Sequence, residues 1–187
     1  PSFAQADAPH IRFATGPVKG AYYAYGEKIL QSLGGRIVPH NKPTAGSVDN
    51  INHLYKDHAD FALVQQDVAA DFLRQHPGSK LKVVRRAFYE FLHILRRKTL
   101  TVDSTDAFRG MQIWPGNPKR GSRYTANNAL DTIGVSPSQY KLVPEVPTVS
   151  QLPQWFRERK LDIAMLVSIP GDNLIRAGLL DETHVFY

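Results

Sequence analysis

The sequence predicts an α/β protein with mostly parallel sheets, divided into two lobes. Short apolar runs of strand length alternate with amphipathic runs of helix length, which is typical of α/β architecture. The 187 residues, of which 42% are hydrophobic, suffice for one substantial domain or two small lobes. The polar segment "TLTVDSTD" is the best place for a division. We therefore predict a first lobe at residues 1–98, a second lobe at 99–180 and the start of a return crossover at 181–187.

Each element of the first lobe has a local reason. The run "AYYAYGEKILQSL" places its apolar side chains on one helical face, and Gly34-Gly35 ends that helix. Ser47 fits the N-cap of a second helix, with Asp49 in its first turn. A third helix, "DVAADFLRQ", ends at "HPGS". Strands are expected at the apolar runs "HIRFATG", "RIVPH", "DFALVQQ", "KLKVVRRAF" and "FLHILRR".

The second lobe continues the alternation. "RYTANNALDTIG" predicts a helix with a regular apolar face that Gly134 ends, and "STDAFRG" predicts a short helix with a glycine stop. Further helices are expected at "VSQLPQWFRERK" and "DNLIRAGLL". Strands are expected at "MQIWPG", "LDIAMLVSIPG" and "HVFY".

Composition and charge limit the kinds of partner and the cellular location that we expect for this protein. The net charge of +6 favours an anionic partner, but the cations are spread along the chain and form no recognisable module with stacking aromatics. We therefore expect no nucleic-acid partner. The longest apolar run is strand-sized and too short to cross a membrane. Ala4-Gln5-Ala6 has the spacing of a signal-peptidase site, which indicates a periplasmic or otherwise extracytoplasmic protein.

Motifs for catalysis and metal binding are missing from the sequence. It contains no phosphate-binding loop, no dinucleotide-binding glycine motif and no hydrolase nucleophile elbow. The absence of cysteine excludes thiol nucleophiles and cysteine-ligated metals. His53 and His58 are five residues apart, so they do not share a helical face as a metal-binding i, i+4 pair would. We expect neither an enzyme, nor a cofactor, nor a metal site.

Three glycine-containing helix starts carry the strongest functional signal. "RFATGP", "TAGSV" and "RGSRY" each stand between a predicted strand and a predicted helix. The first turn of a helix has backbone N–H groups without intrahelical acceptors and a partial positive charge. Glycine lets a ligand approach this backbone, and a hydroxyl adds a donor. We expect the three starts to point at one small carboxylate or phosphate.

The segments "ATGPVKGAYYAYGEKI", "TAGSVDNINHLYKDHADFALVQQDVA", "DAFRGMQIWPGNPKRGSRYTANNAL" and "FRERKLDIAMLVSIPG" follow one another along the chain. In order and spacing they resemble the TAXI family of solute-binding proteins, the extracytoplasmic receptors of a class of TRAP transporters. The most specific part is "TAGSVDN" with "DFALVQQDVA". The resemblance implies a type II periplasmic-binding-protein fold, whose two lobes close over a small anionic solute such as an amino acid or other carboxylate.

The resemblance also implies which residues face the solute. In the first lobe they are Thr15, Gly16, Tyr22, Gly46, Ser47, Asn50 and Gln65. In the second lobe they are Gly121, Ser122, Arg123, Thr125, Ser168 and Pro170. Arg123 is the expected charge partner of the solute, because a guanidinium can bind a carboxylate through two hydrogen bonds. One departure from the family is that Pro17-Val18-Lys19 replaces part of its glycine run.

The resemblance leaves two kinds of partner open. Family members continue beyond the equivalent of residue 187 and return to complete lobe one, so we expect lobe one to be incomplete. Exposed apolar surface would then favour self-association. The expected partners are the membrane subunits of a TRAP-type transporter. The alternative is a periplasmic ligand-sensing domain attached to a membrane-bound signalling receptor.

Overall fold

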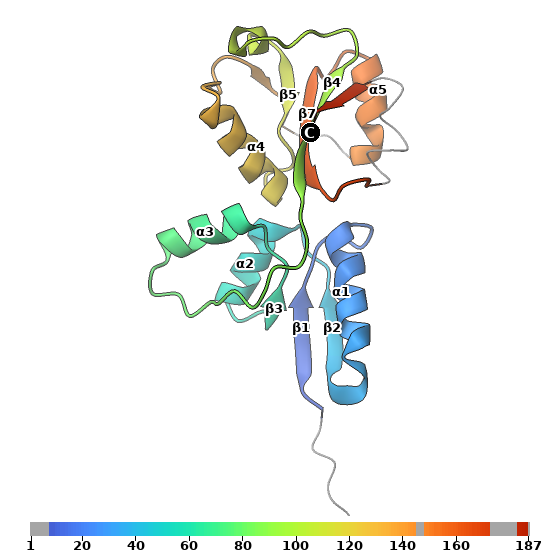
Figure 1. The fold of residues 1–187 in the computed structure, drawn as a ribbon, viewed down its shortest axis with the longest axis vertical. Helices are drawn as coiled ribbons and strands as arrows, with labels where there is room; N and C mark the ends of the chain where they lie inside the picture. The colour runs from blue at the N-terminus through green and yellow to red at the C-terminus, as the bar shows by residue number, and fades with distance from the viewer. Residues whose placement is uncertain (1–7, 145–147, 173–182, 187) are drawn as a thin grey trace, which may run out of the picture. The chain divides into compact units, whose positions relative to one another are not determined.

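The computed structural model describes residues 8–144, 148–172 and 183–186, which form two compact α/β units (Figure 1). The first unit comprises residues 1–87 and the second 88–187. The division therefore falls before β4 (Phe91–Arg97) and not at the predicted position between residues 98 and 99. The reason is that β4 pairs with β7 and β8, which both belong to the second unit.

The first unit contains a parallel sheet of three strands in the order β2-β1-β3. Its strands are β1 (His10–Ala14), β2 (Val38–Lys42) and β3 (Phe61–Ala62). Its helices are α1 (Ala21–Ser32), α2 (Ser47–Tyr55) and α3 (Gln66–Gln75), with a 3₁₀ turn at Gly34–Arg36. Each helix follows a strand, so the alternation read from the sequence is confirmed in this unit.

Close contact between α1 and the sheet depends on Gly26. A Cβ at this position would lie 2.5 Å from Thr15 Cγ2, so a larger residue would push the helix away. The helix is also bound by Asn41 of β2, whose Nδ2 donates to the carbonyl of Tyr23 (3.1 Å) and to Glu27 Oε1 (2.7 Å). Thr15 Oγ1 in turn donates to Asn41 Oδ1 (2.7 Å). The loop after β1 is thereby fixed against β2 and α1.

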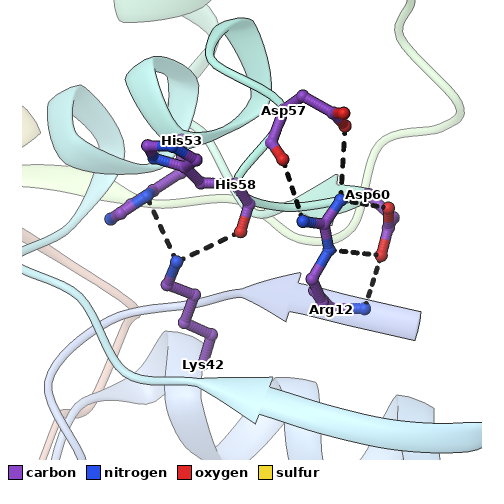
Figure 2. A network of polar contacts seen from close by, with 6 residues as sticks. All are labelled: Arg12, Lys42, His53, Asp57, His58 and Asp60. Atoms are coloured by element: carbon purple, nitrogen blue, oxygen red, sulfur yellow. Dashed lines mark hydrogen bonds and ion pairs between the residues drawn. The ribbon is translucent and has the colours of Figure 1, made fainter. Parts of the chain in front are cut away.

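A polar network joins β1 and β2 to the turn that precedes β3 (Figure 2). Arg12 of β1 contacts both oxygens of Asp60 through Nε (3.1 Å) and Nη2 (2.8 Å), and its backbone N–H donates to Asp60 Oδ2 (2.7 Å). Arg12 Nη1 also donates to the carbonyl of Asp57 (2.8 Å). Lys42 Nζ donates to the carbonyl of His58 (3.1 Å) and lies 3.3 Å from His53 Nδ1. The turn 57–60 is therefore anchored to the sheet at several points.

The second unit contains a five-stranded mixed sheet in the order β6-β5-β7-β4-β8. Its strands are β4, β5 (Gln112–Trp114), β6 (Lys141–Leu142), β7 (Ile163–Ser168) and β8 (Thr183–Phe186). The pairs β5–β6 and β5–β7 are parallel, whereas β4 is antiparallel to β7 and β8. Its helices are α4 (Gly121–Thr132) and α5 (Leu152–Arg157), with 3₁₀ turns at Thr105–Phe108 and Val149–Gln151.

Helices α4 and α5 lie on opposite faces of this sheet (Figure 1). Ala126 and Leu130 of α4 pack with Ile113, Ile163 and Met165. On the other face, α5 packs with alternate strand residues, and that cluster contains Leu95, Trp114, Leu152, Phe156, Ala164 and Leu166. Because successive strand residues point to opposite faces, the apolar run of β7 supplies both clusters.

The buried carboxylate of Asp162 joins three strands at one edge of this unit. Asp162 is 8% exposed and precedes β7. Its Oδ1 accepts from Arg97 Nη2 (2.5 Å) and Nε (3.1 Å), while Oδ2 accepts from the backbone N–H of Gln112 (2.8 Å). Arg97 ends β4 and Gln112 begins β5. One side chain therefore fixes the register at which β4, β5 and β7 meet.

Several sequence expectations need correction. Residues 80–88, predicted as a strand, have no regular secondary structure, and Val83 and Val84 are 78% and 77% exposed. No strand of the described residues pairs with this segment, so its backbone makes no strand-to-strand hydrogen bonds. The strand β3 has only two residues. The short helix predicted at "STDAFRG" is confirmed as a 3₁₀ helix at Thr105–Phe108. The predicted helix "DNLIRAGLL" lies outside the described residues except for its first residue, Asp172.

We expect Asp162→Asn to lower the free energy of unfolding by about 2–3 kcal/mol, because Arg97 would lose its buried counter-charge. Chemical denaturation followed by circular dichroism measures the change. The control is Asp106→Asn, which removes an ion pair to Arg109 whose side chains are 69% and 78% exposed. That pair should contribute less than about 1 kcal/mol. Equal effects of the two substitutions would contradict the role assigned to Asp162.

The pH dependence of stability should reveal the Arg12–Asp60 contact. Hydrogen bonds from Arg12 lower the pKa of Asp60 to about 2, whereas an unfolded Asp titrates near pH ~4. Folded Asp60 therefore holds fewer protons than unfolded Asp60 between these values. Its stabilising effect is complete above pH ~4 and is lost as the pH falls towards ~2.

Urea titrations of the wild type and Asp60→Asn across this range test the assignment. The difference in unfolding free energy should be largest near neutral pH, at about 1 kcal/mol, and should shrink on acidification. Arg12→Gln should remove the same pH-dependent component, since Asp60 loses its partner. A difference that stays constant with pH would show that Asp60 does not titrate as described.

Candidate functional site

In the first unit, the buried amide of Asn50 gathers the loops that follow all three strands. Asn50 belongs to α2 and is fully buried. Its Nδ2 donates to the carbonyl of Thr15 after β1 and to the carbonyl of Leu63 after β3 (2.7 Å). Its Oδ1 accepts from Thr44 Oγ1 after β2 (2.5 Å). The predicted residues Thr15 and Asn50 are thus brought together, with their side chains buried and used in internal hydrogen bonds.

Ser47 connects the start of α2 to α1 and to the segment after β3. Its Oγ accepts from the backbone N–H of Gln65 (3.0 Å), and lies 3.4 Å from Tyr22 Oη and 3.3 Å from Gln65 Oε1. The sequence predicted Ser47 as the N-cap, but the N-cap is Gly46, with φ at 129°, and Ser47 is the first helical residue. The contact with Gln65 uses the hydroxyl that a cap would have used.

The positive potential at the start of α2 is partly balanced by side-chain acceptors of the same unit. The backbone N–H of Gly46 donates to Thr44 Oγ1 (3.2 Å), and that of Ala45 donates to Asp49 Oδ2 (3.0 Å). Asp49 places a negative charge at the positive end of the helix. Gly16, another predicted residue, accepts from the N–H of Thr44 (3.3 Å) and packs against Tyr22. The first-unit residues therefore form one connected polar cluster.

In the second unit, β5 leads through residues 115–120 into α4. Gly116 has φ at 93°, and a Cβ there would lie 3.0 Å from the backbone nitrogen of Arg123. Glycine is required because both the conformation and the space exclude a side chain. Ser122 Oγ accepts from the N–H of Val167 (3.0 Å), which joins the first turn of α4 to the end of β7. The loop, the helix start and the strand end are therefore held together.

Arg123 donates to backbone carbonyls of the segments that precede and follow α4 in the chain. Its Nε donates to the carbonyl of Gly116 (2.7 Å) and its Nη2 donates to the carbonyl of Pro144 (3.0 Å). Burial lowers the pKa of Arg123, and burial likewise raises the pKa of the nearby Tyr140. These contacts give Arg123 an evident structural role, whereas its predicted contact with the solute stays a prediction.

The other predicted residues of this unit lie at the same end of the sheet. Gly121 is buried as the first residue of α4, and Thr125 follows one turn later. Ser168 ends β7 and is 7% exposed. Its hydroxyl donates to Asp172, and its carbonyl lies 3.3 Å from Nε2 of the fully buried His93. Ser168 is therefore held by two partners within the unit, next to the Val167 that contacts α4.

Arg120 is a residue that the sequence reasoning missed. It is the N-cap of α4 and is partly buried, and burial lowers its pKa. Its side chain has no hydrogen-bond or ion-pair partner among the described residues. The sequence did contain a signal, since "KRGSR" places three cations at a helix start with no acidic residue in the first turn.

Three further observations concern other kinds of site. A hollow of about 300 Å³ in the first unit contains none of the predicted residues and is lined by Leu54, Tyr55, Gly78, Ser79, Lys80 and Leu81. The described residues contain no group of three or more histidine, aspartate or glutamate side chains placed to hold a metal ion. None of the helices that the structure describes is long and apolar enough to span a membrane.

The fold is similar to that of solved binding proteins. The periplasmic aliphatic sulphonate binding protein SsuA from Escherichia coli superposes with a TM-score of 0.62 at 15% identity, over 94% of this chain and 56% of that chain. The alkanesulfonate-binding protein SsuA from Xanthomonas axonopodis pv. citri, bound to MOPS, superposes with a TM-score of 0.60 at 12% identity, over 97% of this chain and 61% of that chain. A putative L-cystine ABC transporter from Listeria monocytogenes superposes with a TM-score of 0.62 at 13% identity, over 95% of this chain and 76% of that chain.

These identities establish the fold alone, which is the predicted α/β fold of periplasmic binding proteins. The chain spans little more than half the length of the two SsuA structures. No curated protein matches the sequence. The resemblance to TAXI receptors is supported in its coarser part, similarity to periplasmic solute-binding proteins, while the structures named above include an ABC-type protein. A sequence profile of the NMT1-like family matches residues 13–177, and the chain therefore belongs to the NMT1-like family.

Proposed function

We propose that this protein is an extracytoplasmic solute-binding protein that captures a small anionic solute for a membrane transporter. The observation that carries the proposal is the pair of helix starts, of α2 and of α4, each held at the carboxyl ends of parallel strands by side-chain hydrogen bonds. In α/β proteins this is where ligands bind. The role is binding and not catalysis.

Charge favours an anionic solute. The start of α4 has Lys119, Arg120 and Arg123 with no acidic residue in its first turn, and the net charge of the chain is +6. Cations at the positive end of a helix repel its partial charge, so this arrangement is favourable when an anion is bound. A carboxylate or a sulfonate meets this requirement. The SsuA structures are described as binding sulfonates, which agrees with this class of solute.

The proposed contacts in the first unit are Gly16, Tyr22, Gly46, Ser47 and Gln65, supported by Thr15 and Asn50. Those of the second unit are Gly121, Ser122, Arg123, Thr125 and Ser168. We propose that these residues bind the solute within their own units. The motif order resembles that of TAXI receptors, and on that ground we propose a TRAP-type transporter as the partner.

A thermal-shift screen tests the binding function. The panel consists of L-glutamate, glutarate, 2-oxoglutarate and butane-1-sulfonate, with uncharged glutaramide as the matched control for glutarate. At 100 times its Kd, a solute that binds only the folded state stabilises by about 2.7 kcal/mol, which raises Tm by several degrees. At least one anion should produce this shift and glutaramide should not. No shift with any of the four anions would refute the proposed function.

Substitution of Tyr22 by Phe tests the contacts proposed in the first unit. The change removes only the hydroxyl that lies beside Ser47 Oγ, so stability should fall by less than about 1 kcal/mol. The Kd of the solute identified in the screen, measured by calorimetry, should rise about tenfold because a hydrogen bond to a charged group is lost. The control is Tyr55→Phe, since Tyr55 is 51% exposed and packs against Phe72. Unchanged affinity in Tyr22→Phe would remove this residue from the site.

A further inference from the structure

Arg120 differs from the other partly buried arginines of the chain. Among the residues that the structure describes, five arginines are neither buried nor fully exposed, namely Arg12, Arg96, Arg97, Arg120 and Arg123. Arg12 and Arg97 contact aspartates, while Arg96 and Arg123 donate to backbone carbonyls. Arg120 alone has no side-chain partner in these ranges. A guanidinium that is removed from water normally has a compensating partner, because its desolvation is costly.

The surroundings of Arg120 increase this cost. It is the N-cap of α4, a twelve-residue helix whose first turn contains no acidic residue. Lys119 precedes it and Arg123 lies in the first turn. The charges of these cations and the helix dipole repel one another. By contrast, the start of α2 has Asp49, whose carboxylate accepts from the N–H of Ala45.

Arg123 is poorly suited to act as the charge partner. Its Nε and Nη2 already donate to the carbonyls of Gly116 and Pro144, so it cannot present a two-pronged contact to a carboxylate with those atoms. The loop 115–120 that Arg123 holds is the one that carries Arg120.

We propose that Arg120, in place of Arg123, is the residue of the second unit that pairs with the negatively charged group of the solute. The role of Arg123, named above among the proposed contacts, is then to position the loop. This inference rests on the proposed binding function and specifies its chemistry. The planar guanidinium selects a carboxylate or sulfonate, to which it donates two parallel hydrogen bonds. A bound anion supplies the counter-charge that Arg120 lacks within the described part of the chain.

Calorimetric titration of the wild type and three variants with the four anions of the screen tests the inference. Arg120→Gln should raise the Kd of the anion that binds about 10- to 100-fold, as expected for loss of a charge-assisted contact. Arg120→Lys keeps the charge but cannot donate two parallel hydrogen bonds. Its Kd should therefore lie between those of the wild type and Arg120→Gln. Lys119→Gln changes the same net charge at an exposed neighbouring position and should alter the Kd less than about threefold.

A second measurement separates recognition from structure. Without solute, Arg120→Gln should leave Tm unchanged or raise it, because a cation without a counter-charge is removed from the positive end of α4. Arg123→Gln should lower Tm, because two backbone anchors are lost. A Kd unchanged in Arg120→Gln, or a Tm lowered as far as in Arg123→Gln, would overturn the inference and leave the binding function standing. Failure of the wild type to bind any of the four anions would overturn the binding function and this inference with it.

Discussion

The polar cluster of the first unit depends on one buried amide. Asn50 donates through Nδ2 to carbonyls after β1 and β3 and accepts through Oδ1 from a hydroxyl after β2. A buried carbonyl without a donor costs about 1–3 kcal/mol, so three strand ends are held by a residue that no apolar side chain can replace. Ser47 begins the same helix, and Tyr22 Oη of α1 lies 3.4 Å from Ser47 Oγ. The geometry of the polar cluster therefore follows from the burial of Asn50.

Much of the fold follows from local patterns. The helices α1 and α4 have apolar side chains at helical spacing and end near glycines, so their existence and approximate bounds are predictable. Two errors have non-local causes. Residues 80–88 have the composition of a strand, but a strand also needs a neighbour, and local sequence does not supply one. The boundary between the units lies earlier than the sequence predicts, because the antiparallel pairing of β4 with β7 joins residues far apart in the chain.

For single residues of the candidate site, too, local sequence does not determine the tertiary contacts. Ser47 has the local preference of an N-cap, yet its hydroxyl is bound to the N–H of Gln65, eighteen positions away. Arg123 was chosen from the motif, whereas the contacts to Gly116 and Pro144 depend on how the loops fold around α4. The sequence predicts where the helices α2 and α4 begin, because their glycines and hydroxyls are local features. It does not identify which cation remains without a partner, because that depends on tertiary contacts.

The two helix starts differ in how far their positive potential is balanced by acidic side chains. At α2, Asp49 and the hydroxyl of Thr44 accept backbone donors, so much of the positive potential there is already balanced within the unit. At α4 no acidic residue stands in the first turn, and the hydroxyl of Ser122 accepts from Val167 of β7. Polar but nearly neutral surfaces select shape and hydrogen-bonding pattern, whereas an unbalanced cation selects charge. Under the proposed function, the second unit would therefore distinguish an anion from a neutral solute, and the first unit would distinguish one anion from another.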